Sequence, residues 1–168
     1  MPDIIIKPSA KSTSKAKLVT VVAAKAKRKV HWRSKNSLNW KLITQMTPLE
    51  KVAIANKRIS KTELEQLKRS TELDYSTLSN ILSISRATLI NKKGNEKFAV
   101  AQSERIFALA DIYAYGYEVF EDKDKFNHWI NESNKALGGQ KPLELLNSQF
   151  GKEEVKRLIG RIDYGVYS

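Results

Sequence analysis

A short basic segment, residues 85–93, contains the residue types that read DNA. Its sequence, SRATLINKK, includes one arginine, one asparagine and two lysines. Arginine pairs with guanine and asparagine with adenine through two hydrogen bonds each, while lysine contacts phosphate. A serine at a helix start suits a backbone phosphate, because free N–H groups follow it. The DNA-binding residues predicted on this basis are Ser85, Arg86, Thr88, Asn91, Lys92 and Lys93.

Two short helices and a tight turn could position these side chains, since residues 75–93 have the pattern of a helix-turn-helix unit. Such a unit needs a small residue where the helices cross, a turn residue and two apolar residues that fix the angle. Ser79, Ser83, Ile84 and Leu89 supply them here, with serine at a turn position where glycine is common. The second helix, expected over 86–93 and ended by Gly94, would enter the major groove. The alternative is an ordinary helical hairpin that contacts no DNA.

The other chemically distinctive segment is the chain end, LIGRIDYGVYS. It predicts a helix that stops at Gly165 and leaves Tyr164, Val166 and Tyr167 beside Arg161. Aromatic residues next to an arginine are typical of the energetic centre of a protein interface. The alternative is that the tyrosines fold back onto the core of their own domain.

The last 50 residues also resemble a known family, the antitoxins of the RES–Xre toxin–antitoxin class, also called the Xre/ParS type. The shared pattern has a tryptophan, an L-G-G-x-x-P-x-x-L-L segment, a glycine, and a G-R-I-x-Y-G-V ending. The residues that match are Trp129, Leu137-Gly138-Gly139, Pro142, Leu145-Leu146, Gly151, Val155, Leu158-Ile159-Gly160-Arg161-Ile162 and Tyr164-Gly165-Val166-Tyr167-Ser168. The resemblance extends to roughly residues 60–168, because the helix-turn-helix candidate lies where the family keeps its Xre-like DNA-binding unit.

The resemblance implies a type II antitoxin with two activities. One end would bind the operator of its own operon, and the other would bind a RES-domain toxin, which consumes NAD, and block its active site. Toxin-binding residues implied on this chain are Arg161, Tyr164, Gly165, Val166, Tyr167 and Ser168. A pocket that holds NAD must be cationic for the pyrophosphate and must offer faces for the rings. We hypothesise that a carboxylate and two tyrosines could occupy both kinds of subsite.

The elements that position these residues are all expected to be helices. No run of residues alternates with period two, and the apolar spacing is three and four throughout. Capping boxes at Thr47/Glu50 and Ser60/Glu63 begin two helices. The first is expected to turn one face inward, formed by Val52, Ile54, Ala55 and Ile59. The second is expected to end near Arg69. Further helices are expected after Asp74, from Ser103, after Asp122, from Pro142, and over about 152–163. The fold class is therefore all-α.

The charge of the chain divides it into three predicted regions. The net charge is +12, and residues 1–46 carry 11 Lys/Arg against one acid. This basic, mostly flexible N-terminal arm is expected to attract nucleic acid and lies outside the family pattern; a solvated tail is the alternative. Residues 47–102 form the predicted helix-turn-helix region, and residues 103–168 the helical dimerisation and toxin-binding domain.

Several classes of function are disfavoured by composition. The chain has no cysteine and only two histidines, His31 and His128, so thiolate chemistry is excluded and the composition disfavours a histidine metal site. The acids Glu121, Asp122 and Asp124 fit a helix cap better than a catalytic pair. No stretch approaches the roughly 20 apolar residues of a membrane span. We expect no enzyme activity, no cofactor, no membrane partner and a cytoplasmic location, with a transit peptide as the minor alternative.

The favoured interpretation is therefore an antitoxin and repressor that acts as a homodimer within a larger toxin–antitoxin complex. A second interpretation is a stand-alone helix-turn-helix transcriptional regulator whose C-terminal domain only dimerises. A third is a protein-interaction module whose hairpin contacts no DNA.

Overall fold

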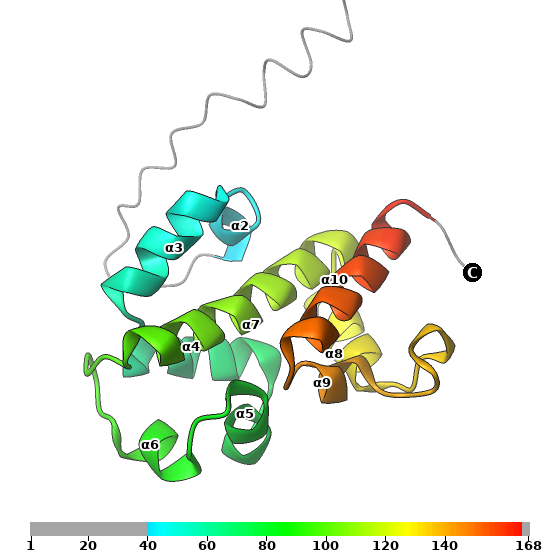
Figure 1. Cartoon of the computed structure of the whole chain (residues 1–168). Helices are drawn as coiled ribbons and strands as arrows, with labels where there is room; N and C mark the ends of the chain where they lie inside the picture. Colours follow the sequence, from blue (N-terminus) through cyan, green and yellow to red (C-terminus); the bar gives the residue numbers. More distant parts are fainter. Residues whose placement is uncertain (1–39, 166–168) are drawn as a thin grey trace, which may run out of the picture. The chain divides into compact units, whose positions relative to one another are not determined.

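The computed structural model describes the backbone of residues 40–165 and the side chains of residues 42–165. Predictions that fall on residues 1–39, and on Val166, Tyr167 and Ser168, lie outside these residues. The elements are α2 (Trp40–Ile43), α3 (Pro48–Lys57), α4 (Lys61–Thr71), α5 (Tyr75–Leu82), α6 (Arg86–Asn91), α7 (Val100–Phe120), α8 (Lys123–Asn131), the 3-10 helix η1 (Lys135–Leu137), α9 (Pro142–Leu145) and α10 (Gln149–Asp163) (Figure 1). The all-α prediction is confirmed for this part of the chain.

The longest helix, α7, is the centre of the described fold (Figure 1). It packs against α2, α3, α4 and α5, which precede it in the sequence, and against α8 and α10, which follow it. Ile106, Leu109, Ala110 and Tyr113 are fully buried along it, at the three and four spacing of a helix face. One core therefore supports both candidate sites.

The predicted start of α7 at Ser103 is wrong by three residues. The helix begins at Val100, where the Gln102 side chain accepts a hydrogen bond from the Ala99 N–H over 3.1 Å. Ser103 is instead buried, and its Oγ accepts from the Ile59 N–H over 2.9 Å. Its hydroxyl therefore fastens α7 to the α3–α4 junction and does not cap a helix.

The two capping boxes are confirmed. The backbone N–H of Thr47 donates to Glu50 over 2.8 Å, and that of Ser60 donates to Glu63 over 2.7 Å. The inward face expected for the first helix is partly wrong, because Val52 is 53% exposed. α3 is a short helix that lies on the outside of α7 and turns only part of its apolar surface inward.

An aromatic cluster, buried at Tyr113 and Phe126 and half-buried at its other members, joins α8 to the second half of α7. Its members, which meet mostly edge to face, are Tyr113, Tyr117, Phe120, Phe126 and Trp129. The helices cross at Gly116, where a Cβ would lie 2.2 Å from the Phe126 ring. Only glycine permits this approach, so Gly116 sets the angle at which the C-terminal helices leave the core.

One buried carboxylate ties three helices together. Asp111 on α7 accepts a hydrogen bond from Lys51 of α3 over 2.6 Å and a second from Lys156 of α10. Burying a carboxylate is costly unless it is paired, and here each oxygen has its own ammonium. Asp111 thus links α3 to α7 and to the last helix, α10.

Two features, a membrane-spanning helix and a metal site, are not found among the described residues. No helix there is long and apolar enough to cross a membrane. The same part of the chain contains no group of three or more His, Cys, Asp or Glu side chains placed to hold a metal ion.

Candidate functional site

The turn between α5 and α6 is built around Ser83. This residue has a left-handed backbone, φ 49° and ψ 46°, which explains why glycine is common at this position. Ser79 Oγ donates to the Ile84 carbonyl over 2.7 Å, and Arg105 of α7 donates to the Leu82 and Ser83 carbonyls over 3.3 and 3.1 Å. The helices and turn predicted within residues 75–93 are therefore present over residues 75–91, and Arg105 holds the turn by contacts that the sequence did not predict.

The predicted DNA-binding residues lie along α6 and the loop after it. Ser85 caps α6, and its Oγ accepts from the Thr88 N–H over 3.1 Å and lies 2.7 Å from Thr88 Oγ1. The side chains of Ser85, Arg86, Asn91 and Lys93 are exposed, and those of Thr88 and Lys92 are half-buried. The geometry leaves Arg86, Asn91 and Lys93 as the most available groups for contact with a polyanion.

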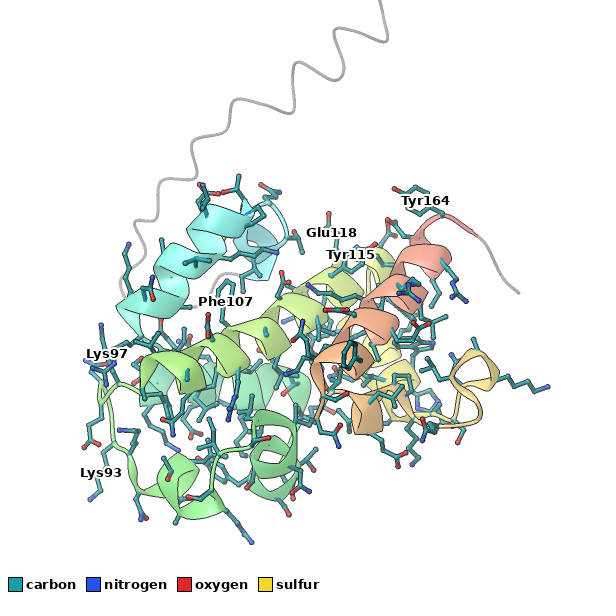
Figure 2. All side chains as sticks on the ribbon, viewed as in Figure 1. Lys93, Lys97, Phe107, Tyr115, Glu118 and Tyr164 are labelled. Atoms are coloured by element: carbon teal, nitrogen blue, oxygen red, sulfur yellow. The ribbon has the colours of Figure 1, made fainter. Side chains whose placement is uncertain are left out.

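α6 ends two residues earlier than expected. Lys92 has an extended backbone, with φ −63° and ψ 145°, and its ammonium lies over the Phe98 ring, 5.5 Å from the centroid. The chain then turns at Gly94, whose carbonyl accepts from the N–H and hydroxyl of Thr62. Lys93 and Lys97 lie along this loop, on the side of the molecule that carries α6 (Figure 2). The cationic surface thus continues from the helix into the loop.

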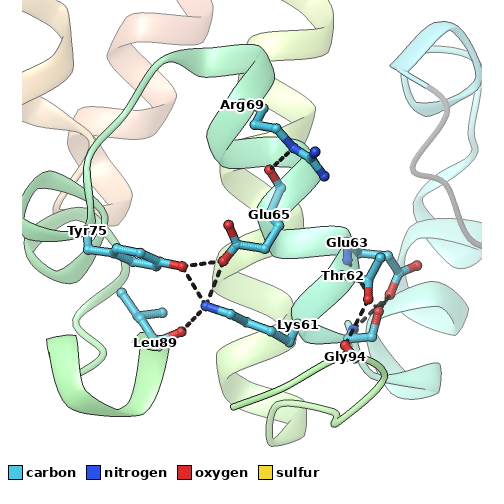
Figure 3. Close-up of polar contacts among 9 residues, drawn as sticks. Lys61, Thr62, Glu63, Glu65, Arg69, Tyr75, Leu89 and Gly94 are labelled. Atoms are coloured by element: carbon cyan, nitrogen blue, oxygen red, sulfur yellow. Dashed lines mark hydrogen bonds and ion pairs between the residues drawn. The ribbon is translucent and has the colours of Figure 1, made fainter. Parts of the chain in front are cut away.

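Sequence reasoning missed the residue that holds α6 in place, Lys61. Its side chain is buried, and its ammonium contacts Tyr75 Oη and Glu65 Oε1, each over 2.6 Å, and the carbonyl of Leu89 in α6 (Figure 3). All three N–H donors therefore have an acceptor. The only signal in the sequence is the Lys61–Glu65 spacing of four, which marks a helix-face ion pair.

The charge state of this cluster follows from its contacts. Burial acts to lower the pKa of Lys61, but hydrogen bonds to Glu65 and Tyr75 outweigh it and hold the pKa above its usual value. Burial acts to raise the pKa of Glu65, but hydrogen bonds from Lys61 and Tyr75 hold that pKa below its usual value. Lys61 and Glu65 are thus a stable charged pair beside α6.

The second candidate site begins with the glycine turn between α8 and α9. Gly138 and Gly139 have φ of 67° and 83°, a left-handed backbone that side-chain-bearing residues rarely adopt. Asn134 closes the turn, because its Oδ1 accepts from the Ala136 N–H and its carbonyl from the Gly139 N–H, each over 2.9 Å. Pro142 then begins α9 as expected, and it is buried.

The α9–α10 joint explains another glycine of the family pattern. A Cβ on Gly151 would lie 1.9 Å from the Leu145 carbonyl oxygen, so the backbones of the two helices touch there. Ser148 caps α10 by accepting from the Gly151 N–H over 3.0 Å. The helix consequently begins at Gln149, before the start expected near Lys152. Its buried stripe includes Val155, Leu158 and Ile159.

The end of α10 packs on Tyr115 of α7 and then projects into solvent. A Cβ on Gly160 would lie 3.3 Å from Tyr115 Oη, so this glycine lets the tyrosine cross the helix. Burial raises the pKa of Tyr115, and the nearby Asp163 carboxylate adds to the effect. Tyr164 is 83% exposed, which rules out self-packing for this tyrosine (Figure 2). Gly165, with φ 68°, ends the helix.

Arg161 is half-buried and lies 3.7 Å from Glu154, which also pairs with Arg157 over 2.6 Å. Of the predicted toxin-binding residues, the structure thus brings Arg161, Tyr164 and Gly165 together at one helix end. Val166, Tyr167 and Ser168 lie outside the described residues.

Comparison with known proteins identifies the C-terminal part of the chain. Residues 116–165 match the model of the antitoxin Xre/MbcA/ParS C-terminal toxin-binding domain. The resemblance to Xre/ParS-type antitoxins seen in the sequence is thereby confirmed, and this region is a toxin-binding domain of that family.

Curated relatives agree with this assignment. The chain is 22% identical over 152 residues to a protein of Sphingobium sp. (strain YBL2) named Prs ADP-ribosylating antitoxin, covering 84% of this chain and 95% of the relative. It is 33% identical over 76 residues to an antitoxin Xre of Photorhabdus laumondii, covering 45% and 51%. A third match, an antitoxin Xre of Yersinia enterocolitica, is 33% identical over 85 residues, covering 50% and 57%. The chain thus spans nearly all of the first relative and about half of the other two.

Proposed function

We propose that this chain neutralises a RES-domain, NAD-consuming toxin by placing its C-terminal tail in the active site of the toxin. The observation that carries the proposal is Tyr164, 83% exposed at the end of a toxin-binding domain and directed away from the core. A tyrosine so placed offers a ring for stacking in a nucleotide pocket. In this proposal the chain acts by occupying the pocket and takes no part in the reaction.

The name of one relative is consistent with this class of toxin. ADP-ribosylation transfers ADP-ribose from NAD, so a toxin with that activity has an NAD pocket for a tail to block. Hydrolysis or phosphorolysis of NAD would need the same pocket. The proposal therefore concerns the occupied site and holds for each of these reactions.

Removal of residues Tyr164–Ser168 tests the tail. The affinity-tagged full chain is first used to co-purify its toxin from cells that carry the operon, and NAD consumption by the toxin is then measured with each antitoxin variant. Truncation should restore NAD consumption while operator binding stays at the wild-type level. Complete inhibition by the truncated chain contradicts the plug. The Leu49→Ala variant, altered on α3, is the control that should still neutralise.

We further propose that α6 reads the operator and that the chain acts as a homodimer on a near-palindromic site. Arg86 is exposed in the first turn of α6, and Lys93 and Lys97 extend the cationic surface. Operator and NAD are both cytoplasmic, so the proposed location is the cytoplasm. The competing function, a stand-alone regulator, predicts operator binding without any co-purified toxin.

Gel shifts on the promoter of the operon test the DNA contacts. Arg86→Ala should weaken binding by about 1–3 kcal/mol and relax one base position. Removal of residues 1–39, which keeps the packed helix α2, should lower both the affinity and its salt dependence, because phosphate contacts release counterions. Unchanged binding and base preference in Arg86→Ala would mean that α6 does not read DNA.

A further inference from the structure

Phe150 is a large apolar side chain that the described part of the chain leaves uncovered. It lies in the first turn of α10 and is 85% exposed, more than any other large hydrophobic residue described. Burying a phenylalanine is worth roughly 1.5–3 kcal/mol relative to leaving it in water. Single exposed apolar side chains are common on protein surfaces, so Phe150 indicates a binding surface only together with its neighbours on the helix.

Phe150 shares one face of α10 with the residues at the helix end. At 3.6 residues per turn, positions 7, 11 and 14 residues further on fall after about 2, 3 and 4 turns. Those positions are Arg157, Arg161 and Tyr164. We call these four residues the α10 row; it has an exposed aromatic residue at each end and two arginines between them. With a rise of 1.5 Å per residue, the row is about 21 Å long.

The arginines of the row are already oriented. Glu154 pairs with Arg157 over 2.6 Å and lies 3.7 Å from Arg161, so one carboxylate holds both guanidinium groups along the helix. The side chain of Arg157 is still 64% exposed. Arginine and aromatic residues on one surface are the composition enriched at interface centres, and orienting them in advance lowers the entropic cost of binding.

The tail alone is too small for a stable complex. A tyrosine buries roughly 200 Å², so Tyr164 and Tyr167 together supply about 400 Å². A standard-size interface takes about 800 Å² from each partner. A second contact surface would bring the interface to standard size, and the α10 row ends at the first residue of the tail and lies within the matched residues 116–165.

We propose that the α10 row is a docking surface for the toxin, seated on the rim of its active site, with Phe150 as the anchor at the far end. This inference rests on the proposed function and extends it. The tail would block the pocket, while Phe150 and Arg157 would hold the toxin by contacts outside the pocket. Binding and blocking are then separable properties of α10.

The test compares Phe150→Ala with Leu49→Ala, which removes an 81% exposed apolar side chain from α3. Affinity for the co-purified toxin is measured by surface plasmon resonance, and inhibition by NAD consumption. Phe150→Ala should raise Kd at least tenfold, mainly through faster release, yet still inhibit fully at saturating concentration because the tail is intact. Leu49→Ala should stay within twofold of the wild type. Thermal unfolding of both variants should match the wild type, since neither side chain is in the core.

A Kd for Phe150→Ala within twofold of the wild type overturns the proposal. It is also overturned if Phe150→Ala changes the sedimentation of the free chain and leaves the toxin affinity unchanged, because the row would then pair two copies. Truncation of the tail reports separately on the proposed function. A truncated chain that binds but no longer inhibits, beside a Phe150→Ala chain that binds weakly but inhibits, supports both. Absence of any complex with the wild-type chain refutes both.

Discussion

The helix α6 and the helix α10 present their functional residues in opposite ways. α6 is short and is held from several sides: Ser85 caps it, Arg105 clamps the turn before it, and Lys61 binds the carbonyl of Leu89. α10 is long, packs on the core along one stripe, and leaves the aromatic residues of the α10 row exposed. One surface is fixed in position by polar contacts, whereas the other is a free face on a firmly anchored helix.

This difference matches the demands of the two proposed partners. Reading base edges requires donors and acceptors held to within a fraction of an ångström, which hydrogen bonds to the backbone of α6 provide. Gripping a protein depends instead on apolar area and on a few anchors. Single substitutions should consequently affect stability, operator binding and toxin binding differently at the two surfaces. Four variants test this difference.

Gly151→Ala should have the largest effect. Its new Cβ would lie 1.9 Å from the Leu145 carbonyl oxygen, so the α9–α10 joint must open. We expect a loss of about 3 kcal/mol in unfolding free energy, measured by urea denaturation, together with loss of toxin binding. Gly160→Ala on the same helix is the matched control: its Cβ meets only the tip of the Tyr115 side chain, at 3.3 Å. Equal losses for the two variants would contradict the proposed joint.

Lys61→Met should mainly damage the DNA-binding surface. It removes three hydrogen bonds, takes this donor from the Leu89 carbonyl, and leaves Glu65 without its paired charge although Tyr75 still donates to it. We expect a cost of about 2 kcal/mol in unfolding free energy. Operator affinity should fall while toxin affinity is retained. Lys68→Met is the control, because Lys68 also lies over the Tyr75 ring, at 5.2 Å, on the same helix. The role of Lys61 is refuted if both variants bind the operator equally well.

Asp111→Asn should weaken both surfaces slightly. The substitution keeps the shape of the side chain but removes the charge that Lys51 and Lys156 share. We expect a fall of about 1 kcal/mol in unfolding free energy, smaller at high salt. Glu154→Gln is the control, since Glu154 pairs only within α10 and should contribute a few tenths of a kcal/mol. A larger loss for Glu154→Gln than for Asp111→Asn would contradict the central role of Asp111.

Glu65→Gln should have the smallest effect, visible in the dependence of stability on pH. Because the pKa of Glu65 is lower in the folded chain, the unfolded chain binds more protons between that pKa and the ordinary value near 4.3. The stabilisation is therefore complete above that ordinary value and is lost as the pH falls through the folded pKa. Urea denaturation at pH 7, 5 and 3 should show a flatter fall for Glu65→Gln than for the wild type. Tyr75→Phe should flatten it less, because the Lys61 pair remains.

Local signals in the sequence predicted the helices well. The caps at Thr47, Ser60, Asp74 and Asp122 all begin helices, because a cap depends only on residues within one turn. The glycine at 165 likewise follows the end of α10 as expected. The start of α7 was wrong because a distant contact decided it: Ser103 bonds Ile59, 44 residues away, and so does not begin the helix. The start of α10 was wrong because the local cap at Ser148 was overlooked.

The candidate sites divide in the same way. The residues on the surface of α6 and at the end of α10 could be named from residue type and family pattern. Lys61 could not, because its partner Leu89 lies 28 residues along the chain and the contact exists only after folding. Phe150 gave no signal either, since an apolar residue in an amphipathic helix is normally expected to be buried. Its exposure becomes apparent only when the phase of α10 is known.

Gly151 also fixes the position from which α10 extends. The backbone contact at Leu145 fixes where the helix starts, so the distance and rotation between its first turn and Tyr164 are set by the number of residues between them. Insertion of one residue in the middle of α10 would rotate the end by about 100° and advance it by about 1.5 Å. Insertion of seven residues would restore the rotation almost completely and leave only a longer reach. Partner choice can therefore be changed by helix length, without any change in the contacting side chains.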